Sequence, residues 1–126
     1  MTIKHINPDT VGKAAGPYTH MVETDDYVYM SGQAPIDPHT GELVSGTFRE
    51  EADLVFQNII SNLEYVGLNL THVVKVNAFL GDLSYRTEYN EMYQQYFKPP
   101  FPARTTIGCD LGTLKIEIEV VACKRK

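Results

Sequence analysis

The sequence predicts a single α+β domain, in which a mixed β-sheet is covered on one face by two helices. The chain has 126 residues, the length of one ordinary domain. Two stretches repeat their apolar residues at helical spacing, and several shorter stretches alternate between apolar and polar residues as strands do. Amphipathic helices that cover the apolar face of a sheet form an α+β domain. We therefore expect one domain over residues 1–126 with the element order ββαβαββ.

The first half of the chain predicts two strands and a helix. The segment Met21–Met30 indicates two short strands that meet at Asp25 and Asp26, since aspartate tolerates turn geometry. A helix is expected to begin near Thr47, because a glutamate three residues later completes a capping-box pattern. The apolar residues that follow share one helical face: Ala52, Val55, Phe56, Ile59, Ile60, Leu63 and Val66. Gly67 can take the left-handed conformation that ends such a helix.

The second half predicts a strand, a helix and two final strands. Residues His72–Leu80 alternate as a strand with one apolar face: Val74, Val76, Ala78 and Leu80. A second helix is expected to start near Ser84, a good N-cap residue, and to run through Phe97, because Pro99 and Pro100 prevent its continuation. Its apolar stripe is rich in tyrosine: Tyr85, Tyr89, Met92, Tyr93, Tyr96 and Phe97. The segments Ala103–Cys109 and Lys115–Cys123 complete the sheet.

Composition argues against several classes of protein. Eleven basic and 16 acidic residues give a net charge of −5, whereas a duplex-binding protein normally carries a broad cationic face. No stretch approaches the roughly 20 apolar residues that span a bilayer. The N-terminal residues lack the apolar run of a secretory signal. Two cysteines are too few for a disulfide framework. We therefore expect a cytoplasmic protein with no membrane partner and no nucleic-acid partner.

Common catalytic signatures are missing from the sequence. It contains no phosphate-binding glycine loop, no His-Glu-x-x-His and no Gly-x-Ser-x-Gly. The four histidines are far apart in sequence: His5, His20, His39 and His72. We therefore expect no metal site. Cys109 and Cys123 are interpreted as small, half-buried hydrophobic residues rather than nucleophiles.

The residues alone leave two interpretations open for the charged groups on the last two strands. Arg104 lies on a predicted strand, where its guanidinium could bind a carboxylate with two parallel hydrogen bonds or form an ordinary surface ion pair. Glu117 and Glu119 share one face of the final strand. They could belong to a solvated face, or one of them could orient a water molecule as a base. The tyrosine-rich helix face is interpreted as core.

Six short motifs occur in order along the chain. They are Gly16-Pro17-Tyr18, Ser31-Gly32-Gln33-Ala34-Pro35-Ile36, the loop from Asp37 to Glu42, Tyr89-Asn90-x-x-Tyr93, Pro102-Ala103-Arg104 and Lys115-Ile-Glu-Ile-Glu119. Each motif is weakly specific by itself, but the six together resemble the YjgF/RidA family of reactive-intermediate deaminases over essentially the whole chain. The resemblance implies a chorismate-mutase-like fold, a homotrimer with three clefts between subunits, and no cofactor or metal. It also implies hydrolysis of 2-imino acids and their enamine tautomers, such as 2-iminobutanoate and 2-iminopropanoate, to 2-oxo acids and ammonia.

The resemblance also assigns roles to individual residues. Arg104 matches the family arginine that holds the substrate carboxylate, and Glu117 matches the residue that activates the attacking water. The other implied substrate-binding positions are Tyr18, Ser31, Gly32, Asn90 and Thr106. Thr106 stands where many family members have cysteine, so no thiol role is expected there. The segment between Arg104 and Lys115 is about two residues shorter than in typical members, which could alter substrate preference.

Two other functions remain open at this stage. A protein on the same fold could bind small carboxylates and act as a sensor or partner-binding protein without turnover. The family has also carried the label of ribonuclease, but the charge of −5 and the lack of a basic stripe with interleaved aromatic residues count against that function.

Overall fold

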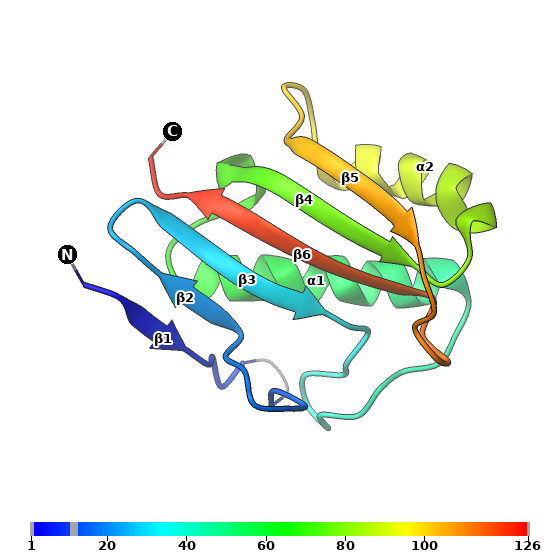
Figure 1. The fold of residues 1–126 in the computed structure, drawn as a ribbon, viewed down its shortest axis with the longest axis horizontal. Helices are drawn as coiled ribbons and strands as arrows, with labels where there is room; N and C mark the ends of the chain where they lie inside the picture. Colours follow the sequence, from blue (N-terminus) through cyan, green and yellow to red (C-terminus); the bar gives the residue numbers. More distant parts are fainter. Residues whose placement is uncertain (1, 11–12, 126) are drawn as a thin grey trace.

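The computed structural model describes residues 2–10 and 13–125, and these residues form a six-stranded sheet with two α-helices (Figure 1). The strands are β1 (Lys4–Ile6), β2 (Met21–Glu23), β3 (Tyr27–Gln33), β4 (Val73–Leu80), β5 (Ala103–Gly108) and β6 (Ile116–Cys123). Their order across the sheet is β1-β2-β3-β6-β4-β5. The helices are α1 (Phe48–Tyr65) and α2 (Arg86–Tyr96), and both lie behind the sheet in Figure 1. The predicted α+β architecture is confirmed.

The sheet is mixed because one pair of neighbouring strands is parallel. β4 and β5 pair in parallel and are joined through α2, whereas the other pairs are antiparallel. The two strands predicted in Met21–Met30 are present as β2 and β3. Strand β1, which pairs with β2 through Lys4–Ile6, was not predicted from the sequence. A strand of three residues with two polar side chains has too little alternation to stand out in a sequence.

Helix α1 begins and ends where its capping residues predict. The Thr47 hydroxyl accepts a hydrogen bond from the Glu50 N–H at 3.2 Å, and the Glu50 carboxylate accepts one from the Thr47 N–H at 2.9 Å. This reciprocal pair is a complete capping box. Beyond the last residue of the helix, Gly67 adopts a φ of +77°. The left-handed conformation there allows the chain to turn towards β4.

Helix α2 starts later than predicted, and Ser84 is not its cap. Asp82 accepts a hydrogen bond from the Ser84 N–H at 2.8 Å and caps a short 3₁₀ turn, Leu83–Tyr85. The α-helix itself begins at Arg86. An ionised carboxylate accepts a hydrogen bond from a backbone N–H more strongly than a hydroxyl does. Asp82, two residues before Ser84, therefore acts as the cap in place of Ser84. The helix ends at Tyr96, one residue before the predicted end at Phe97 and ahead of the two prolines.

The apolar face of β4 was predicted correctly except at Val74. Val76, Ala78 and Leu80 are buried, but Val74 is 43% exposed and Val73 is buried in its place. The pairing of β4 with β6 shifts between Val73 and Lys75, so an extra residue reverses the alternation at the start of the strand. A bulge of this kind cannot be predicted from a run of consecutive valines.

The core lies between the helices and the central strands. β6 contributes every second residue to it: Ile116, Ile118, Val120 and Ala122. From α1 and α2 the core receives Val55, Phe56, Ile59, Tyr89 and Met92, all almost fully buried. The opposite face of the sheet has no layer of the described chain above it (Figure 1). The charged residues of β6 lie on that open face.

Replacement of Gly67 with alanine is expected to destabilise the fold, because a Cβ in the left-handed region costs about 1–2 kcal/mol. Gly67→Asn should recover much of that loss, since asparagine tolerates this conformation better than alanine. Urea unfolding followed by circular dichroism measures both variants. Equal midpoints for wild type and Gly67→Ala would contradict the left-handed turn.

Candidate active site

Arg104 lies at the edge of the sheet, on the face that the helices cover. It stands on β5 beside Val76, a core residue of β4. Its guanidinium carbon lies 4.6 Å from the centre of the Tyr93 ring and 5.3 Å from that of Tyr89. Aromatic faces attract cations at such distances, so two tyrosines of α2 form a platform beneath the guanidinium.

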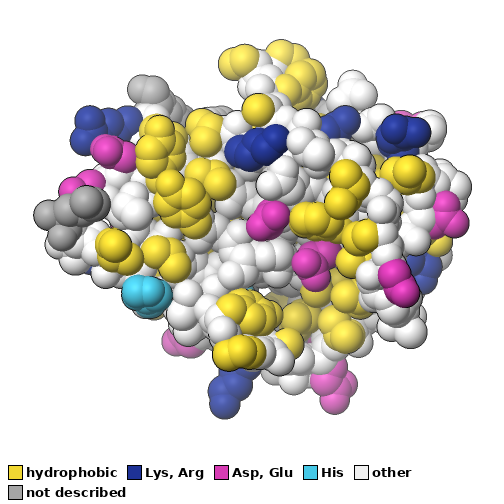
Figure 2. Space-filling model, in the orientation of Figure 1, with side chains coloured by type: hydrophobic (Ala, Val, Ile, Leu, Met, Phe, Trp, Pro, Cys, Tyr) yellow, Lys and Arg dark blue, Asp and Glu magenta, His cyan; other side chains and the backbone are white. Residues whose placement is uncertain are grey.

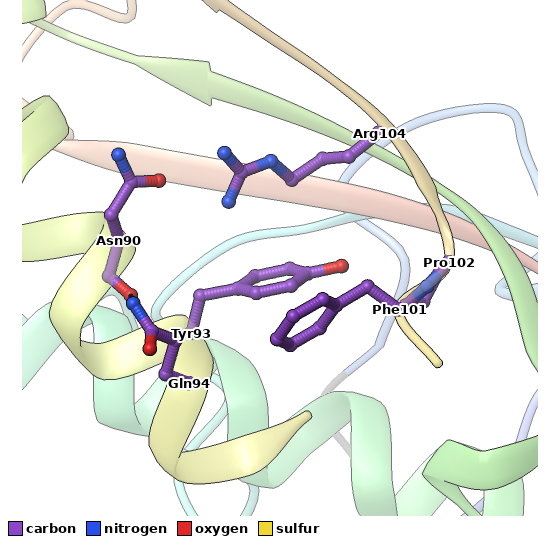
Figure 3. Close-up of a pocket in the computed structure, with 6 residues that line it drawn as sticks. All are labelled: Asn90, Tyr93, Gln94, Phe101, Pro102 and Arg104. Carbon is purple, nitrogen blue, oxygen red and sulfur yellow. Dashed lines mark hydrogen bonds between the residues drawn. The ribbon is translucent and has the colours of Figure 1, made fainter. Parts of the chain in front are cut away.

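A cavity of about 540 Å³ opens beside this platform. It is lined by Asn90, Tyr93, Gln94, Phe101, Pro102 and Arg104. Figure 3 shows the side chains of Asn90 and Arg104 facing each other across the space above the Tyr93 ring. The cavity therefore combines a cation, an amide and aromatic surface.

Arg104 has no carboxylate partner among the described residues. The ion pairs of Arg49 and Arg125 with nearby acids are present, but none involves Arg104. The surface-ion-pair interpretation of Arg104 is therefore wrong for the described part of the chain. The planar fork of the guanidinium remains available for a carboxylate from outside the chain.

Four buried polar atoms near Arg104 have no hydrogen-bond partner in the described structure. They are Asn90 Oδ1, Thr106 Oγ1 and the hydroxyl oxygens of Tyr89 and Tyr93. Burial raises the pKa of both tyrosine hydroxyls, and the positive charge of Arg104 offsets this only in part. The two phenols are therefore neutral at physiological pH. Buried groups of this kind need a partner, and a polar ligand can supply one.

Glu117 lies on the opposite, open face of the sheet. It alternates with the buried residues Ile116 and Ile118 on β6 and stands opposite Phe79 of β4. A second cavity, of about 310 Å³, opens beside Glu117. The cavity is lined by Tyr18, Ser31, Gly32, Glu117 and Glu119. Three of the predicted substrate-binding residues, Tyr18, Ser31 and Gly32, therefore lie beside the predicted base.

A β-bulge brings Ser31 and Gly32 to Glu117. The register between β3 and β6 shifts between Met30 and Gln33, which leaves Ser31 and Gly32 outside the regular pairing. The Ser31 hydroxyl donates to the Thr19 carbonyl at 2.6 Å, and the Gln33 amide donates to the Ser31 carbonyl at 3.0 Å. These bonds hold the bulge, a device that often re-aims residues beside active sites.

A side chain on Gly32 would press against the carboxyl group of Glu117. A Cβ on Gly32 would lie 2.9 Å from the carboxyl carbon of Glu117, a separation that real side chains essentially never show. A larger residue would displace the carboxylate. The glycine of the Ser-Gly-Gln motif therefore leaves room for the Glu117 carboxyl group in its present position.

The environment of Glu117 favours its protonated form. Partial burial raises the pKa of the Glu117 carboxyl, and the negative charge of Glu119 raises it further. Glu119 itself accepts a hydrogen bond from the Asn77 amide at 3.4 Å. A carboxylate with a raised pKa accepts and returns protons more readily near neutral pH.

The predicted residues form two half-sites rather than one pocket. Arg104, Asn90 and Thr106 lie at the β5 edge on the helix-covered face, whereas Glu117 and its neighbours lie on the open face. Strand β4 separates β5 from β6. A small molecule bound at Arg104 therefore cannot touch Glu117 of the same chain.

Sequence reasoning missed the platform beneath Arg104. Tyr89 and Tyr93 were interpreted as core, and they are buried, but their rings also contact the guanidinium. The only signal was their placement one helical turn apart on either side of Asn90. The pairing of β5 with β4 carries Arg104 over them, and that contact is tertiary.

The described residues contain no group of three or more histidine, cysteine, aspartate or glutamate side chains that could hold a metal ion. Neither Cys109 nor Cys123 lines either of the two cavities. Within residues 2–10 and 13–125, no helix has the length and apolar character needed to cross a bilayer.

Comparison with known proteins places this geometry in a family. The model of the family described as endoribonuclease L-PSP matches residues 9–124. The chain is 41% identical to the human 2-iminobutanoate/2-iminopropanoate deaminase over 111 residues, which cover 86% of this chain and 81% of the human protein.

Two solved structures are similar over nearly the whole chain. RidA from the Antarctic bacterium Psychrobacter superimposes with a TM-score of 0.89 at 34% identity, covering 95% of this chain and 98% of that one. TdcF from E. coli, solved with bound serine, superimposes with a TM-score of 0.86 at 29% identity and covers 96% and 98%. With a family model that matches residues 9–124 and relatives that share both sequence and fold, this chain belongs to the endoribonuclease L-PSP family, also called YjgF/RidA.

Proposed function

We propose that the protein hydrolyses reactive 2-imino acids and their enamine tautomers, including 2-iminobutanoate and 2-iminopropanoate, to 2-oxo acids and ammonia. The observation that carries this proposal is the free guanidinium of Arg104 above its tyrosine platform, in a cavity with no carboxylate of its own among the described residues. Relatives of similar sequence are named as deaminases of these imines, which supports the same conclusion. The serine bound to TdcF also carries a carboxylate.

In this proposal Arg104 holds the substrate and Glu117 moves the protons. The guanidinium fork binds the carboxylate of the imino acid, and the unpaired hydroxyl of Thr106 and amide of Asn90 add hydrogen bonds. An imine protonated on nitrogen is already electrophilic, so orientation and proton transfer provide most of the catalysis. Neither a metal nor a covalent intermediate is needed.

The proposed steps conserve atoms and charge. A water oxygen adds to the iminium carbon while Glu117 accepts one of its protons, which gives a carbon that bears both hydroxyl and amino groups. Glu117 returns the proton to the amino nitrogen. The carbon–nitrogen bond then breaks with its electron pair on nitrogen and releases ammonia. The hydroxyl proton passes through Glu117 to that ammonia, and the 2-oxo acid and ammonium leave. The raised pKa of the Glu117 carboxyl supports its return of the proton.

The proposed site is formed between copies of the chain, as three clefts of a homotrimer. The observation behind this is the separation of the two half-sites on opposite faces of the sheet. The open face also exposes apolar side chains, including 40% of Tyr27 and 47% of Tyr29 on β3. Figure 2 shows this face, with hydrophobic side chains gathered around a few acidic ones. Partly apolar faces of this kind suit subunit interfaces.

One alternative function has structural support. The Arg104 cavity could bind a small carboxylate without Glu117, so a non-catalytic carboxylate sensor is the second candidate. Ribonuclease activity, which the family description names, is less favoured because the chain carries a net charge of −5.

A trapping assay distinguishes deaminase from sensor. A threonine dehydratase generates 2-iminobutanoate, and semicarbazide traps the imine that survives. Micromolar amounts of this protein should reduce the trapped product while 2-oxobutanoate accumulates. Unchanged trapping, together with saturable binding of 2-oxobutanoate in calorimetry, would favour the sensor.

Replacement of Arg104 separates substrate binding from structural support. Truncation of one partner in a desolvated charge pair costs about 2–5 kcal/mol, so Arg104→Ala should lower kcat/KM roughly 30-fold to several-thousand-fold. Arg104→Lys should recover only part of this, because an ammonium lacks the planar fork. Melting temperature and oligomeric state should stay close to wild type. A folded Arg104→Ala oligomer with wild-type turnover would exclude the mechanism.

Mixed oligomers test whether the two half-sites come from different copies. Arg104→Ala and Glu117→Gln chains should each have strongly reduced activity, but unfolding and refolding them together in equal amounts should restore about one quarter of wild-type activity. Each cleft would take Arg104 from one chain and Glu117 from the next chain in a closed ring. Half of the chains in the mixture retain Arg104 and the other half retain Glu117, so about one cleft in four contains both. Light scattering should report about three chains. If turnover does not recover in verified mixed oligomers, both groups act within one chain.

A further inference from the structure

Glu51 is a fully buried carboxylate outside both half-sites. It lies in the first turn of α1 and is 0% exposed. Its two oxygens accept hydrogen bonds from the Lys115 N–H at 2.9 Å, the Lys115 ammonium at 3.1 Å and the Gly46 N–H at 3.3 Å. Burial of an ionised carboxylate is costly unless it is paired and hydrogen-bonded in this way.

Lys115 would be expected to share the face of Glu117. It directly precedes β6, in which Ile116 and Ile118 face the core and Glu117 faces outward. Continued alternation would place its side chain on the open face, two residues from Glu117. Its ammonium instead contacts Glu51, on the helix that covers the other face.

The contact of the Lys115 ammonium with Glu51 matters because of the charges around Glu117. Glu119 lies beside it on β6, and Tyr18 and the bulge in β3 complete its cavity. On β4, the nearest cation is Lys75, whose ammonium donates to the Thr105 hydroxyl at 3.0 Å. Among the described residues, no lysine, arginine or histidine forms an ion pair with Glu117. Lys115 is thus the cation whose place in the sequence, two residues before Glu117, would bring it closest to that carboxyl group.

We propose that Glu51 is a positioning residue that sequesters the Lys115 ammonium, so that Glu117 is left without a cationic partner in its own chain. This inference rests on the proposed role of Glu117 as the proton-transfer group. A cation paired with Glu117 would stabilise its ionised form and make it a weaker base. The sequestered lysine is consistent with the raised pKa of the Glu117 carboxyl.

The primary test removes the charge of Glu51 and keeps its shape. Glu51→Gln retains an oxygen that can accept from the Lys115 N–H, but it releases the ammonium. An opposite charge within about 4–6 Å lowers a carboxyl pKa by about 1–3, so the pKa of Glu117 should fall by about one or more. Carbon-13 NMR of glutamate-labelled protein measures this pKa, with Glu117→Gln to assign the signal. The acidic limb of the kcat/KM profile should move to lower pH by the same amount.

Two further variants separate electrostatics from structure. Glu51→Gln combined with Lys115→Gln removes the released cation, so the pKa of Glu117 should return to the wild-type value even if melting temperature is reduced. Lys115→Gln alone should leave that pKa within about half a unit of wild type, because the ammonium is held elsewhere. Glu50→Gln is the matched control on the same helix turn, since Glu50 contacts Thr47 and not Lys115.

The outcomes are distinct. An unchanged pKa of Glu117 in folded Glu51→Gln would overturn the proposal, as would a lowered pKa that persists in the double variant. If Glu51→Gln does not fold, a rise of about one unit in Lys115→Gln would overturn it, because Lys115 would then already act on Glu117. The NMR titration needs no turnover. A wild-type protein that fails to deaminate would therefore refute the proposed function and leave the sequestration measurable.

Discussion

The alternation of strand β6 is the constraint on which the rest of the structure depends. This strand lies between β3 and β4, and its inward side chains, from Ile116 to Ala122, fill the core beneath α1. Because successive strand residues point to opposite faces, burial of Ile116 and Ile118 forces Glu117 onto the open face. A one-residue shift of register would bury both glutamates of β6 and expose the core, so packing energy also fixes the position of the candidate base.

The same sheet separates the chemical groups that the proposed reaction needs. Arg104 is carried on the edge strand over the tyrosines of α2, while Glu117 faces away from the helices. A fold with one helix-covered face cannot bring both groups to one ligand within a single chain. In the proposed oligomer, the open face of one chain meets the sheet edge of another, which would bring the two groups to one ligand.

Charge pairing differs sharply between structural and candidate functional groups. Buried Glu51 pairs with half-buried Lys115, and Lys124 pairs with Glu23 at the β2–β3 hairpin. Arg104 has aromatic rings beneath it, Glu117 has a neighbouring carboxylate, and in the described chain neither has a counterion. Such unpaired groups lower stability, and proteins tolerate them at sites where a ligand supplies the missing partner.

The sequence by itself determined the architecture, because helical and strand periodicity, the cap at Thr47 and the stop at Gly67 are local signals. The ordered motifs also predicted the members of the candidate site. Tertiary structure alone decided the bulges in β3 and β4, which depend on strand pairing. The cap at Asp82 is local, but the sequence pattern alone did not distinguish it from Ser84. Tertiary structure also decided that the site residues fall into two groups on opposite faces. That division depends on which strands become neighbours, and contacts between residues distant in sequence leave no local pattern to read.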